Sequence, residues 1–298
     1  MALKIEGLSV QVGGVPILKD IDLAIAEGEH FAVLGESGAG KSLLALSIIR
    51  LLPAGSRPEN RILLDGTDLN ALTQQEMRKL RGRTIGMVFE QPWSSLNPAF
   101  SCGSQIAGVV RLHHAVSPAA ARARARHLLR LTGVPVERYT AFPHQLSGGM
   151  QQRVAIAIAL AGDPKLIIAD EAGTALDQER QDRIAALLQS VVSETNAALL
   201  LITHQFRLAR ALCSRGAVMY AGQIVETAQM EMLLDRPRHP YARMLVDAVS
   251  PSGFRPIPGA APEFASMSGG CRFQPRCPFA EEQCAKPPAW TGDVRCWK

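Results

Sequence analysis

The sequence predicts an α/β fold with a mixed β-sheet. Apolar segments of strand length occur at 30–35, 165–170 and 197–203, and a helical stretch at 177–192 separates the last two. This alternation is typical of parallel strands joined by crossover helices. Two further strands, at 3–12 and 17–26, flank a Gly-Gly turn and predict a hairpin. We therefore expect an antiparallel β layer beside the parallel strands.

The composition favours a globular chain. Of the 298 residues, 47% are hydrophobic and 20% are charged, which permits a sizeable core and argues against disorder. The net charge of +5 is too small and too scattered to indicate nucleic acid, so we expect no nucleic-acid partner. The start "MALKIEGLSV" does not resemble a secretory signal, and the longest apolar stretch is far shorter than the roughly 20 residues of a membrane helix. We expect a cytoplasmic protein that is soluble or peripheral to a membrane.

The remaining elements follow in chain order. The sequence predicts a helix at 41–52, a strand and turn at 61–69, a strand at 84–90 and mainly helices over 103–146. After Ser250 the composition shifts to Pro, Gly and Cys, which predicts a main domain over residues 1–250 and an extension over 251–298.

The stretch "GESGAGKS" fits the phosphate-binding pattern G-x-x-x-x-G-K-[ST]. Its glycines let backbone N–H groups face phosphate oxygens, and the following helix offers its positive N-terminal end. Lys41 is expected to neutralise the β- and γ-phosphates, and Ser42 to hold Mg²⁺. An ordinary Gly/Ser turn is the alternative, but a predicted strand and helix flank the loop as the motif requires. The predicted ATP contacts here are Gly35, Glu36, Ser37, Gly38, Ala39, Gly40, Lys41, Ser42 and Leu43.

A pair of acidic residues ends the apolar strand "KLIIADE". Ligands of open α/β sheets bind at the carboxyl ends of the strands, so we expect Asp170 to contact Mg²⁺ there. Glu171 is placed to polarise an attacking water. The alternative, a strand ending in a solvated acidic pair, is less favoured beside a phosphate loop.

A second glycine-containing helix start, "LSGGMQQR", resembles the signature sequence of the ABC ATPases. In that family two nucleotide-binding domains face head to tail, with each ATP held between the phosphate loop of one and the signature of the other. The resemblance implies that Ser147, Gly148 and Gly149 contact the γ-phosphate bound by a second ATPase subunit. The alternative is a simple helix cap.

Other segments extend the resemblance over nearly all of the first 250 residues. "ALD" is similar to the D-loop and would place Asp177 at the dimer seam, while "LLITH" ends at His204, which matches the switch histidine. The resemblance implies a P-loop ABC-type nucleotide-binding domain with a helical subdomain inserted at about 92–160. It implies ATP hydrolysis with Glu171 and His204 as the catalytic residues.

Several segments are similar to the ATPases of bacterial peptide and nickel importers. They are "WSSLNP" at 93–98, "RHPYARMLV" at 238–246 and "GCRFQPRCPFAEEQC" at 270–284. The resemblance implies a peripheral subunit on the cytoplasmic face of the inner membrane, which powers uptake of short peptides through two permease subunits and a substrate-binding protein. Trp93 is expected to help bind a permease. Uptake of nickel or a metal–chelator complex stays open, as do a non-transport ABC ATPase and a catalytically weak nucleotide-binding module.

The six cysteines fall into two groups. Cys102 and Cys213 stand alone and are expected to be core thiols. The others crowd the end of the chain without the C-x2-C pairs of zinc ribbons, and in a reducing compartment they suggest a metal before disulfides. The resemblance implies a [4Fe–4S] cluster, with zinc and then disulfides as alternatives. These residues are Cys271, Cys277, Cys284 and Cys296.

The sequence departs from the family pattern at the nucleotide site. Glu90, followed by Gln91, stands where the family has the glutamine of the Q-loop. We expect Glu90 and Gln91 to contact the nucleotide and Glu90 to bind Mg²⁺ with Ser42 and Asp170. The Glu90 carboxylate would also repel the γ-phosphate and slow hydrolysis. Gln205 follows His204 where aspartate is usual. The aromatic residue that stacks on adenine is missing, and Val12 lies nearest its place.

Overall fold

The computed structural model describes residues 1–298 apart from 92–94, 172–177, 250–255, 261 and 268, with the side chains of 178–184, 193 and 266 also outside the description. Its main sheet has the strand order β10-β9-β3-β8-β7-β6. The pairs of β3 with β8 and β9 and of β7 with β6 and β8 are parallel, whereas β10 is antiparallel to β9. The predicted mixed sheet is confirmed, and its strands are β3 (His30–Leu34), β6 (Ile85–Val88), β7 (Leu166–Asp170), β8 (Ala198–Thr203), β9 (Arg215–Tyr220) and β10 (Gln223–Gln229).

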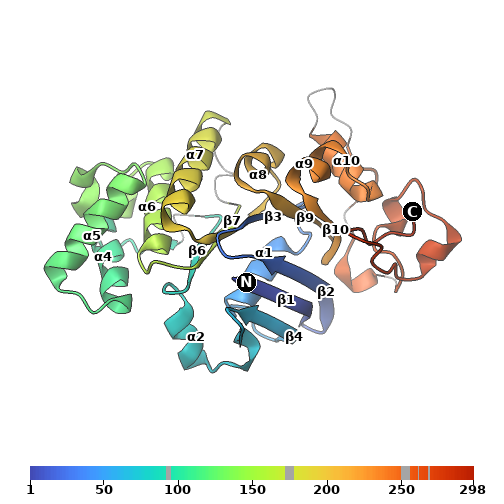
Figure 1. Ribbon diagram of the computed structural model, residues 1–298, viewed down its shortest axis with the longest axis horizontal. Helices are drawn as coiled ribbons and strands as arrows, with labels where there is room; N and C mark the ends of the chain where they lie inside the picture. The colour runs from blue at the N-terminus through green and yellow to red at the C-terminus, as the bar shows by residue number, and fades with distance from the viewer. Residues whose placement is uncertain (92–94, 172–177, 250–255, 261, 268) are drawn as a thin grey trace.

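A second, antiparallel sheet with the order β2-β1-β4-β5 lies beside the main one (Figure 1). Gly13 and Gly14, with φ of 59° and 83°, form the two-residue turn between β1 and β2. Positive φ at both central positions is what the turn of a tight hairpin requires, which is why this Gly-Gly pair predicted it. The strands are β1 (Leu3–Val12), β2 (Val15–Ile25), β4 (Ser56–Leu64) and β5 (Thr67–Asp68).

Two apolar cores cover the two faces of the main sheet. Along β3, Phe31 and Val33 pack in the core shared with the antiparallel sheet, while Ala32 and Leu34 pack in the core under the helices. Because both faces are buried, the strand reads as a continuous apolar run. Helix α1 (Lys41–Ile48) lies between the two sheets and buries Leu44 there.

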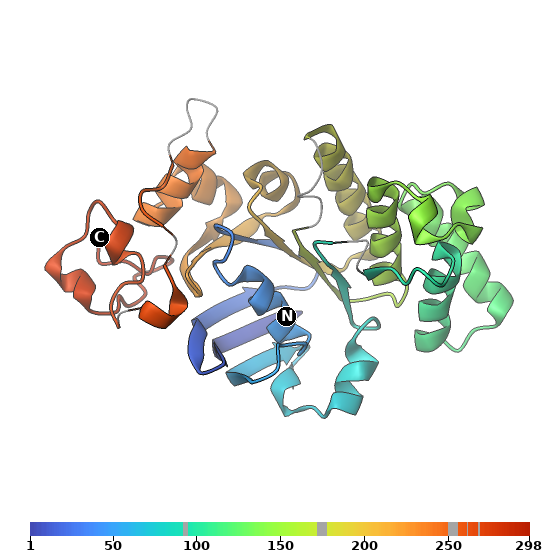
Figure 2. The ribbon, with the colours of Figure 1, turned by 180° about the vertical axis from the view of Figure 1, so that it is seen from behind.

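Apart from α2, which lies beside the antiparallel sheet, the remaining helices cover the other face of the main sheet and its two ends (Figure 2). Three of them lie together at the end remote from the C-terminus: α4 (Cys102–His113), α5 (Pro118–Leu131) and α6 (Gly148–Leu160). Helix α5 starts at Pro118 because Ser117 caps it and proline suits the first helical position. The others are α2 (Gln74–Leu80), α7 (Gln178–Thr195), α8 (Phe206–Leu212), α9 (Met230–Asp235) and α10 (Pro240–Ala248). Among the described helices, none has the length and apolar character needed to cross a membrane.

Short 3₁₀ turns complete the secondary structure. The stretch predicted to be mainly helical over 103–146 ends in two such turns rather than a third helix. They are η1 (Leu69–Ala71), η2 (Val136–Thr140), η3 (Pro143–Gln145), η4 (Phe264–Ser266), η5 (Gln274–Arg276) and η6 (Glu282–Ala285).

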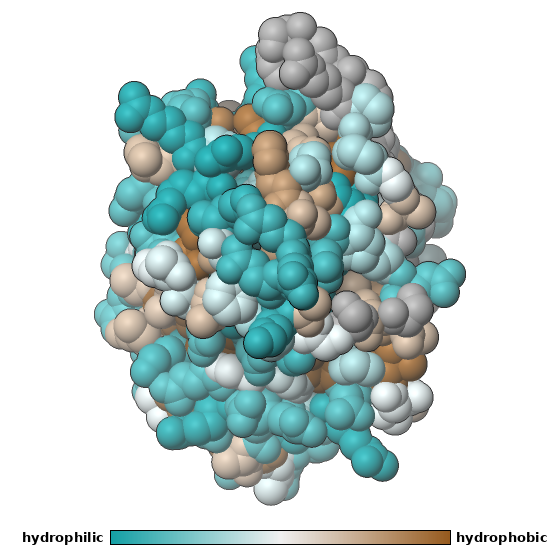
Figure 3. All heavy atoms as spheres, turned by 90° about the vertical axis from the view of Figure 1, so that its right-hand side faces the viewer, coloured by the Kyte–Doolittle hydropathy of each residue, from teal (hydrophilic) through white to brown (hydrophobic). Residues whose placement is uncertain are grey.

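The C-terminal extension lies against the edge of the main sheet. The backbone N–H of Arg295 donates to the Val225 carbonyl at 2.9 Å, and that of Thr227 donates to the Asp293 carbonyl at 2.9 Å. The outer strand β10 is thereby protected from pairing with another chain. The described part of this end of the molecule is largely hydrophilic, with small separate apolar patches (Figure 3).

Candidate active site

The phosphate-type loop joins β3 to α1 and depends on glycine at its first and last motif positions. A Cβ on Gly35 would lie 2.3 Å from the Met219 carbonyl oxygen. Gly40 is the N-cap of α1 with φ of 98°, and a Cβ there would lie 2.9 Å from Cδ2 of Leu18. The loop is therefore pressed against β2 and β9, and larger residues would displace it.

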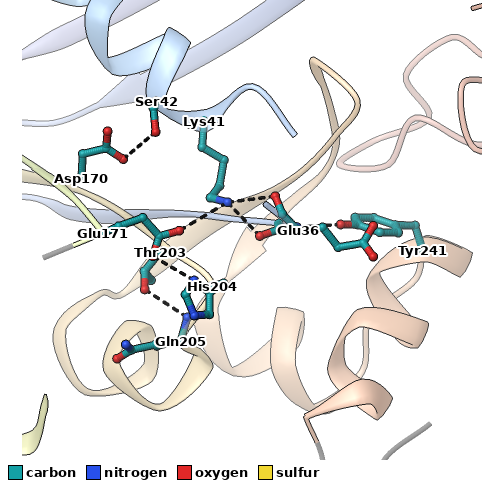
Figure 4. A network of polar contacts seen from close by, with 10 residues as sticks. Glu36, Lys41, Ser42, Asp170, Glu171, Thr203, His204, Gln205 and Tyr241 are labelled. Carbon is teal, nitrogen blue, oxygen red and sulfur yellow. Dashed lines mark hydrogen bonds and ion pairs between the residues drawn. The ribbon is translucent and has the colours of Figure 1, made fainter. Parts of the chain in front are cut away.

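Lys41 reaches back into the curve of this loop. Its ammonium donates hydrogen bonds to the carbonyls of Gly35 at 2.9 Å and Glu36 at 3.0 Å (Figure 4). The same nitrogen lies 3.5 Å from Oε1 of Glu171. The Lys41 side chain is only 5% exposed, so its positive charge is held at the start of α1. The N-terminus of a helix also attracts anions, and both effects would favour a phosphate at this position.

Asp170 ends β7 beside the first turn of α1. Its Oδ1 accepts a hydrogen bond from the Ser42 hydroxyl at 3.1 Å (Figure 4). Burial raises the pKa of Asp170 to about 6, and the negative charges of Glu171 and Glu90 also raise it. The hydrogen bond from Ser42 acts in the opposite direction but is outweighed. A carboxylate destabilised in this way favours a bound cation, and hydroxyl and carboxylate oxygens are the donors that Mg²⁺ prefers. Ser42 and Asp170 thus fit the predicted magnesium position.

Glu171 and His204 form a close ion pair beside that position. Nδ1 of His204 lies 2.9 Å from Oε2 of Glu171. Burial opposes ionisation of Glu171, but its hydrogen bond with His204 and the charge of Lys41 outweigh this effect and lower its pKa. The same hydrogen bond raises the pKa of His204. Glu171 is held ionised and oriented, as a base that accepts a proton from water must be.

A pocket of about 300 Å³ brings these groups together. Most predicted contacts of the loop line it, and Glu90, Glu171 and His204 do so as well. Its lining residues are Ile17, Ser37, Gly38, Gly40, Lys41, Ser42, Leu43, Glu90, Glu171, His204 and Phe264.

Not every predicted site residue lines this pocket. Gly35, Glu36 and Ala39 belong to the loop without lining the pocket, and Gln91 is exposed outside it. Asp170 does not line the pocket either, but it accepts a hydrogen bond from the lining residue Ser42. Asp177 and Trp93 lie outside the described residues. Their assigned roles remain predictions.

The predicted signature segment lies elsewhere, at the exposed start of α6. Ser147 is the N-cap and its hydroxyl accepts a hydrogen bond from the Met150 N–H at 3.4 Å. A Cβ on Gly148 or Gly149 would meet nothing within 4 Å. This helix start contributes nothing to the pocket described above and is open to a ligand brought by another molecule.

Four contacts of the site were not predicted from the sequence. Ile17 and Phe264 line the pocket. The hydroxyl of Tyr241 accepts a hydrogen bond from the Glu36 N–H at 3.0 Å, and Arg276 donates to both carboxylate oxygens of Glu36 at 2.9 and 3.3 Å. Tyr241 and Arg276 lie inside segments that already marked the importer branch, but nothing in their local pattern points to the phosphate loop.

The four C-terminal cysteines lie near one another with free thiols. Burial raises the pKa values of Cys271 and Cys277, and the charges of Cys284 and Cys296 raise both further. The Cys271 N–H also donates to the Cys284 carbonyl at 2.9 Å. Within the described residues, no three His, Cys, Asp or Glu side chains stand close enough to hold a metal ion as they are.

The two isolated cysteines are buried, as predicted. Burial raises the pKa of the Cys102 thiol to about 11 and also raises that of Cys213. Both thiols therefore stay protonated and unreactive in the core.

Comparisons with known proteins identify the family of the chain. A profile described as "ABC transporter" matches residues 18–174, and one described as "Oligopeptide/dipeptide transporter, C-terminal region" matches residues 225–284. A Brucella abortus protein named as a peptide import ATP-binding protein is 40% identical over 297 residues, covering 96% of this chain and 90% of that protein. The oligopeptide transport ATP-binding protein OppD of Mycobacterium tuberculosis is 40% identical over 295 residues, which are 95% of this chain and 48% of OppD.

Solved structures extend the comparison to the fold. A dimeric ATP-binding cassette in a post-hydrolysis state, bound to ADP and Pi, has a TM-score of 0.69 and 30% identity over 76% of this chain and 98% of that one. CbiO1 of Clostridium perfringens, part of an ABC transporter complex, has a TM-score of 0.71 and 26% identity over 84% of this chain and 96% of its own. The chain therefore belongs to the ATP-binding subunits of the ABC transporter family, in the branch that carries the oligopeptide/dipeptide C-terminal region.

Proposed function

We propose that this chain is the ATP-hydrolysing subunit of an ABC importer of short peptides. The observation that carries the proposal is the position of Glu171, which is ionised and held between Lys41 and His204 beside the Ser42–Asp170 pair. Peptides are favoured over nickel or a metal chelate because the relatives described above are named for peptide import. An ionised base in place argues against a catalytically weak binding module.

The residues of the site divide the work of hydrolysis. Lys41 and the N-terminal end of α1 bind the β- and γ-phosphates, and the loop amides complete the cradle. Ser42 and Asp170 would hold Mg²⁺, with Glu90 nearby, and the ion would neutralise charge on the phosphates. Glu171 accepts the proton of the attacking water. His204 keeps the Glu171 carboxylate oriented and faces the pocket in which the γ-phosphate would lie.

A second ATPase subunit is part of the proposal. The start of α6 is exposed and does not line its own pocket, which supports a role of Ser147, Gly148 and Gly149 on the ATP of a partner chain. Asp177 is assigned to the seam between the subunits.

Replacement of Ser147 tests this composite pocket. Ser147→Asp keeps a good helix cap but places a carboxylate next to the partner's phosphate, whereas Ser147→Asn keeps the cap without charge. Both variants also carry Glu171→Gln, which prevents hydrolysis, and dimerisation with ATP is measured by light scattering. We expect Ser147→Asp to abolish ATP-dependent dimerisation. The affinity of the single chain for ATP should stay unchanged. Equal dimerisation of the Asp and Asn variants would refute the composite pocket.

The remaining partners follow from the importer role. Two permease subunits would bind this chain at the cytoplasmic face of the inner membrane, and a substrate-binding protein would deliver the peptide from the other side. We assign residues 1–250 to the ATP-binding domain, about 92–160 to its helical subdomain and 251–298 to the extension. The grouping of α4, α5 and α6 at one end supports the helical subdomain (Figure 1).

Reconstitution tests the function as a whole. The chain is assembled with the permease and binding-protein products of neighbouring genes in proteoliposomes, and uptake of labelled peptides or nickel is measured with ATP inside or outside. We expect ATP-dependent peptide uptake that Glu171→Gln abolishes. Uptake of nickel but not of peptides would overturn the assigned cargo, and the absence of ATP hydrolysis by the assembled complex would overturn the proposal.

For the extension we propose a structural [4Fe–4S] cluster held by Cys271, Cys277, Cys284 and Cys296. Cys271 and Cys277 both lie within the electrostatic influence of Cys284 and Cys296, which supports a shared site. A four-iron cluster is wider than a single zinc ion and holds its ligands further apart. Protein purified without oxygen should be brown and contain about four irons per chain, and Cys277→Ser should lose them. Colourless protein with one zinc per chain would refute the cluster.

A further inference from the structure

We propose that Phe264 of the C-terminal extension is the surface on which the nucleobase of ATP stacks. The inference rests on the proposed ATP site and adds a residue that recognises the nucleoside rather than the phosphates. Among the described residues lining the pocket, Phe264 supplies the one hydrocarbon ring, and Ile17 is its apolar neighbour on that lining. The rest of the lining is glycine, charged or hydroxyl-bearing, apart from Leu43.

The position of the ring relative to the phosphate groups fits a nucleoside. Lys41, Ser42 and Phe264 line one pocket. A pocket for a nucleotide needs both an anion-binding group for the phosphates and a flat apolar surface for the base. Phe264 is half-buried, because it packs against the core under the helices and also lines the pocket.

The turn between β1 and β2, where the resemblance places the aromatic residue that stacks on adenine, has no aromatic side chain. The turn between β1 and β2 reads Val12-Gly13-Gly14-Val15, and a Cβ on either glycine would meet nothing within 4 Å. A base above this turn would find no ring on which to stack. Phe264, which reaches β2 from the other end of the sequence, supplies one.

The segment around Phe264 is fixed in place by charged hydrogen bonds. On its N-terminal side, Pro258 accepts a hydrogen bond at 2.7 Å from Nε of Arg276, whose guanidinium also binds the carboxylate of the loop residue Glu36. On its C-terminal side, Arg272 donates to the Ile17 carbonyl at 3.3 Å and to the Ala221 carbonyl. Figure 1 shows the extension beside β2 and β10.

Hydrogen bonds of charged arginines are stronger than neutral ones, so Arg272 and Arg276 anchor the chain on both sides of Phe264 more firmly than apolar contact alone would. Phe264 is therefore a preorganised element of the pocket, and stacking costs little ordering of the chain. Since every base has a flat face, the ring should favour nucleotides over bare phosphates without choosing between adenine and guanine.

Calorimetric titration of the full chain with ATP, GTP and tripolyphosphate, each with Mg²⁺, tests the inference. We expect Phe264→Ala to weaken ATP and GTP roughly tenfold and to leave tripolyphosphate unchanged, while Phe264→Tyr binds all three like the wild type. Phe279→Ala is the matched control, since Phe279 is a 53% exposed phenylalanine of the same extension that does not line the pocket.

The outcomes separate this inference from the proposed function. Unchanged ATP affinity in Phe264→Ala would overturn the stacking role. An equal loss for ATP and tripolyphosphate would also overturn it, because the ring would then only support the phosphate loop. Failure of the wild type to bind either ligand would overturn the ATP site itself.

Discussion

The nucleotide pocket has two walls of different character. The catalytic wall consists of Lys41, Glu171 and His204 on the pocket lining, together with Asp170, which is hydrogen-bonded to the lining residue Ser42. The carboxyl ends of parallel strands and the start of α1 bring these groups together. The docking wall consists of Phe264, which lines the pocket, and of Tyr241 and Arg276, which support it from outside the lining by binding Glu36 of the phosphate loop. These residues come from α10 and the C-terminal extension. The first wall holds the ionised groups that chemistry needs, and the second positions the loop and the nucleotide. Changes in the first should therefore alter the rate of hydrolysis, and changes in the second should alter binding or stability.

The largest effect is expected on the catalytic wall. Glu171→Gln removes the base but keeps the shape of the side chain, so kcat for ATP hydrolysis by the assembled complex should fall about 1,000-fold. The affinity for ATP should stay within a few-fold, because Lys41 and the loop are intact. A fall in ATP affinity that matches the fall in kcat would show that Glu171 acts in binding and would break the comparison.

On the other wall, the cap of α10 should make stability depend on pH. His239 is buried, its Nδ1 accepts a hydrogen bond from the Tyr241 N–H at 3.0 Å, and burial lowers its pKa to about 3. Because the unfolded chain binds the proton near pH 6.5, this contribution is complete above pH 6.5 and is lost as the pH falls toward 3. We expect the wild type to lose about 2 kcal/mol of unfolding free energy from this group between pH 7.5 and 5.

The matched variant is His239→Asn, since asparagine also caps helices and does not titrate. Urea unfolding of both proteins at the two pH values isolates the contribution of His239 from that of other groups. An identical acid loss in the variant would exclude His239 as its source.

The contact between the docking wall and the phosphate loop should change affinity moderately. Arg276→Ala removes the two hydrogen bonds to Glu36 and should weaken ATP roughly five- to tenfold with little change in kcat. Arg215→Ala is the control, because Arg215 forms a 2.7 Å ion pair with Glu29 at the start of β9, away from the pocket. A similar loss of ATP affinity in both variants would mean that Arg276 acts only through general stability.

The smallest expected effect is a gain of activity. Glu90 lines the pocket, and its charge helps to raise the pKa values of Asp170 and His204. Glu90→Gln removes a carboxylate that repels the γ-phosphate, so ATP turnover of the assembled complex should rise about threefold. Unchanged or lower turnover would contradict the view that Glu90 slows this site.

The catalytic wall could be predicted from the sequence because its signals are local. A glycine loop between strand and helix, and an apolar strand that ends in two acids, each fix their side chains within a few residues. Alternation with helices predicted that the strands are parallel, which the pairing of β8 with β3 and β7 confirms, but it did not predict the strand order. The start of β2 at Val15 was missed because Pro16 follows it and proline argues against a strand. The extension of β4 back to Ser56 was missed because its first five residues, SRPEN, are mostly polar and carry little periodic signal.

The docking wall could not be predicted in the same way. Arg276 and Glu36 are 240 positions apart, and Tyr241 and Glu36 are 205 apart, so no spacing in the sequence relates them. The half-buried Phe264 lies in a short 3₁₀ turn among prolines and glycines, where neither helical nor strand periodicity applies. The resemblance to importer ATPases identified segments 238–246 and 270–284 as typical of that branch, but it did not indicate which residues these segments contact.

The triple attachment of Glu36 has a consequence for anyone who recombines such proteins. Its N–H, carbonyl and carboxylate bind Tyr241, Lys41 and Arg276 in turn. A chimaera that exchanges the C-terminal part between homologues would preserve the shape of the phosphate loop only if the residues at positions 36, 241 and 276 all came from the same parent.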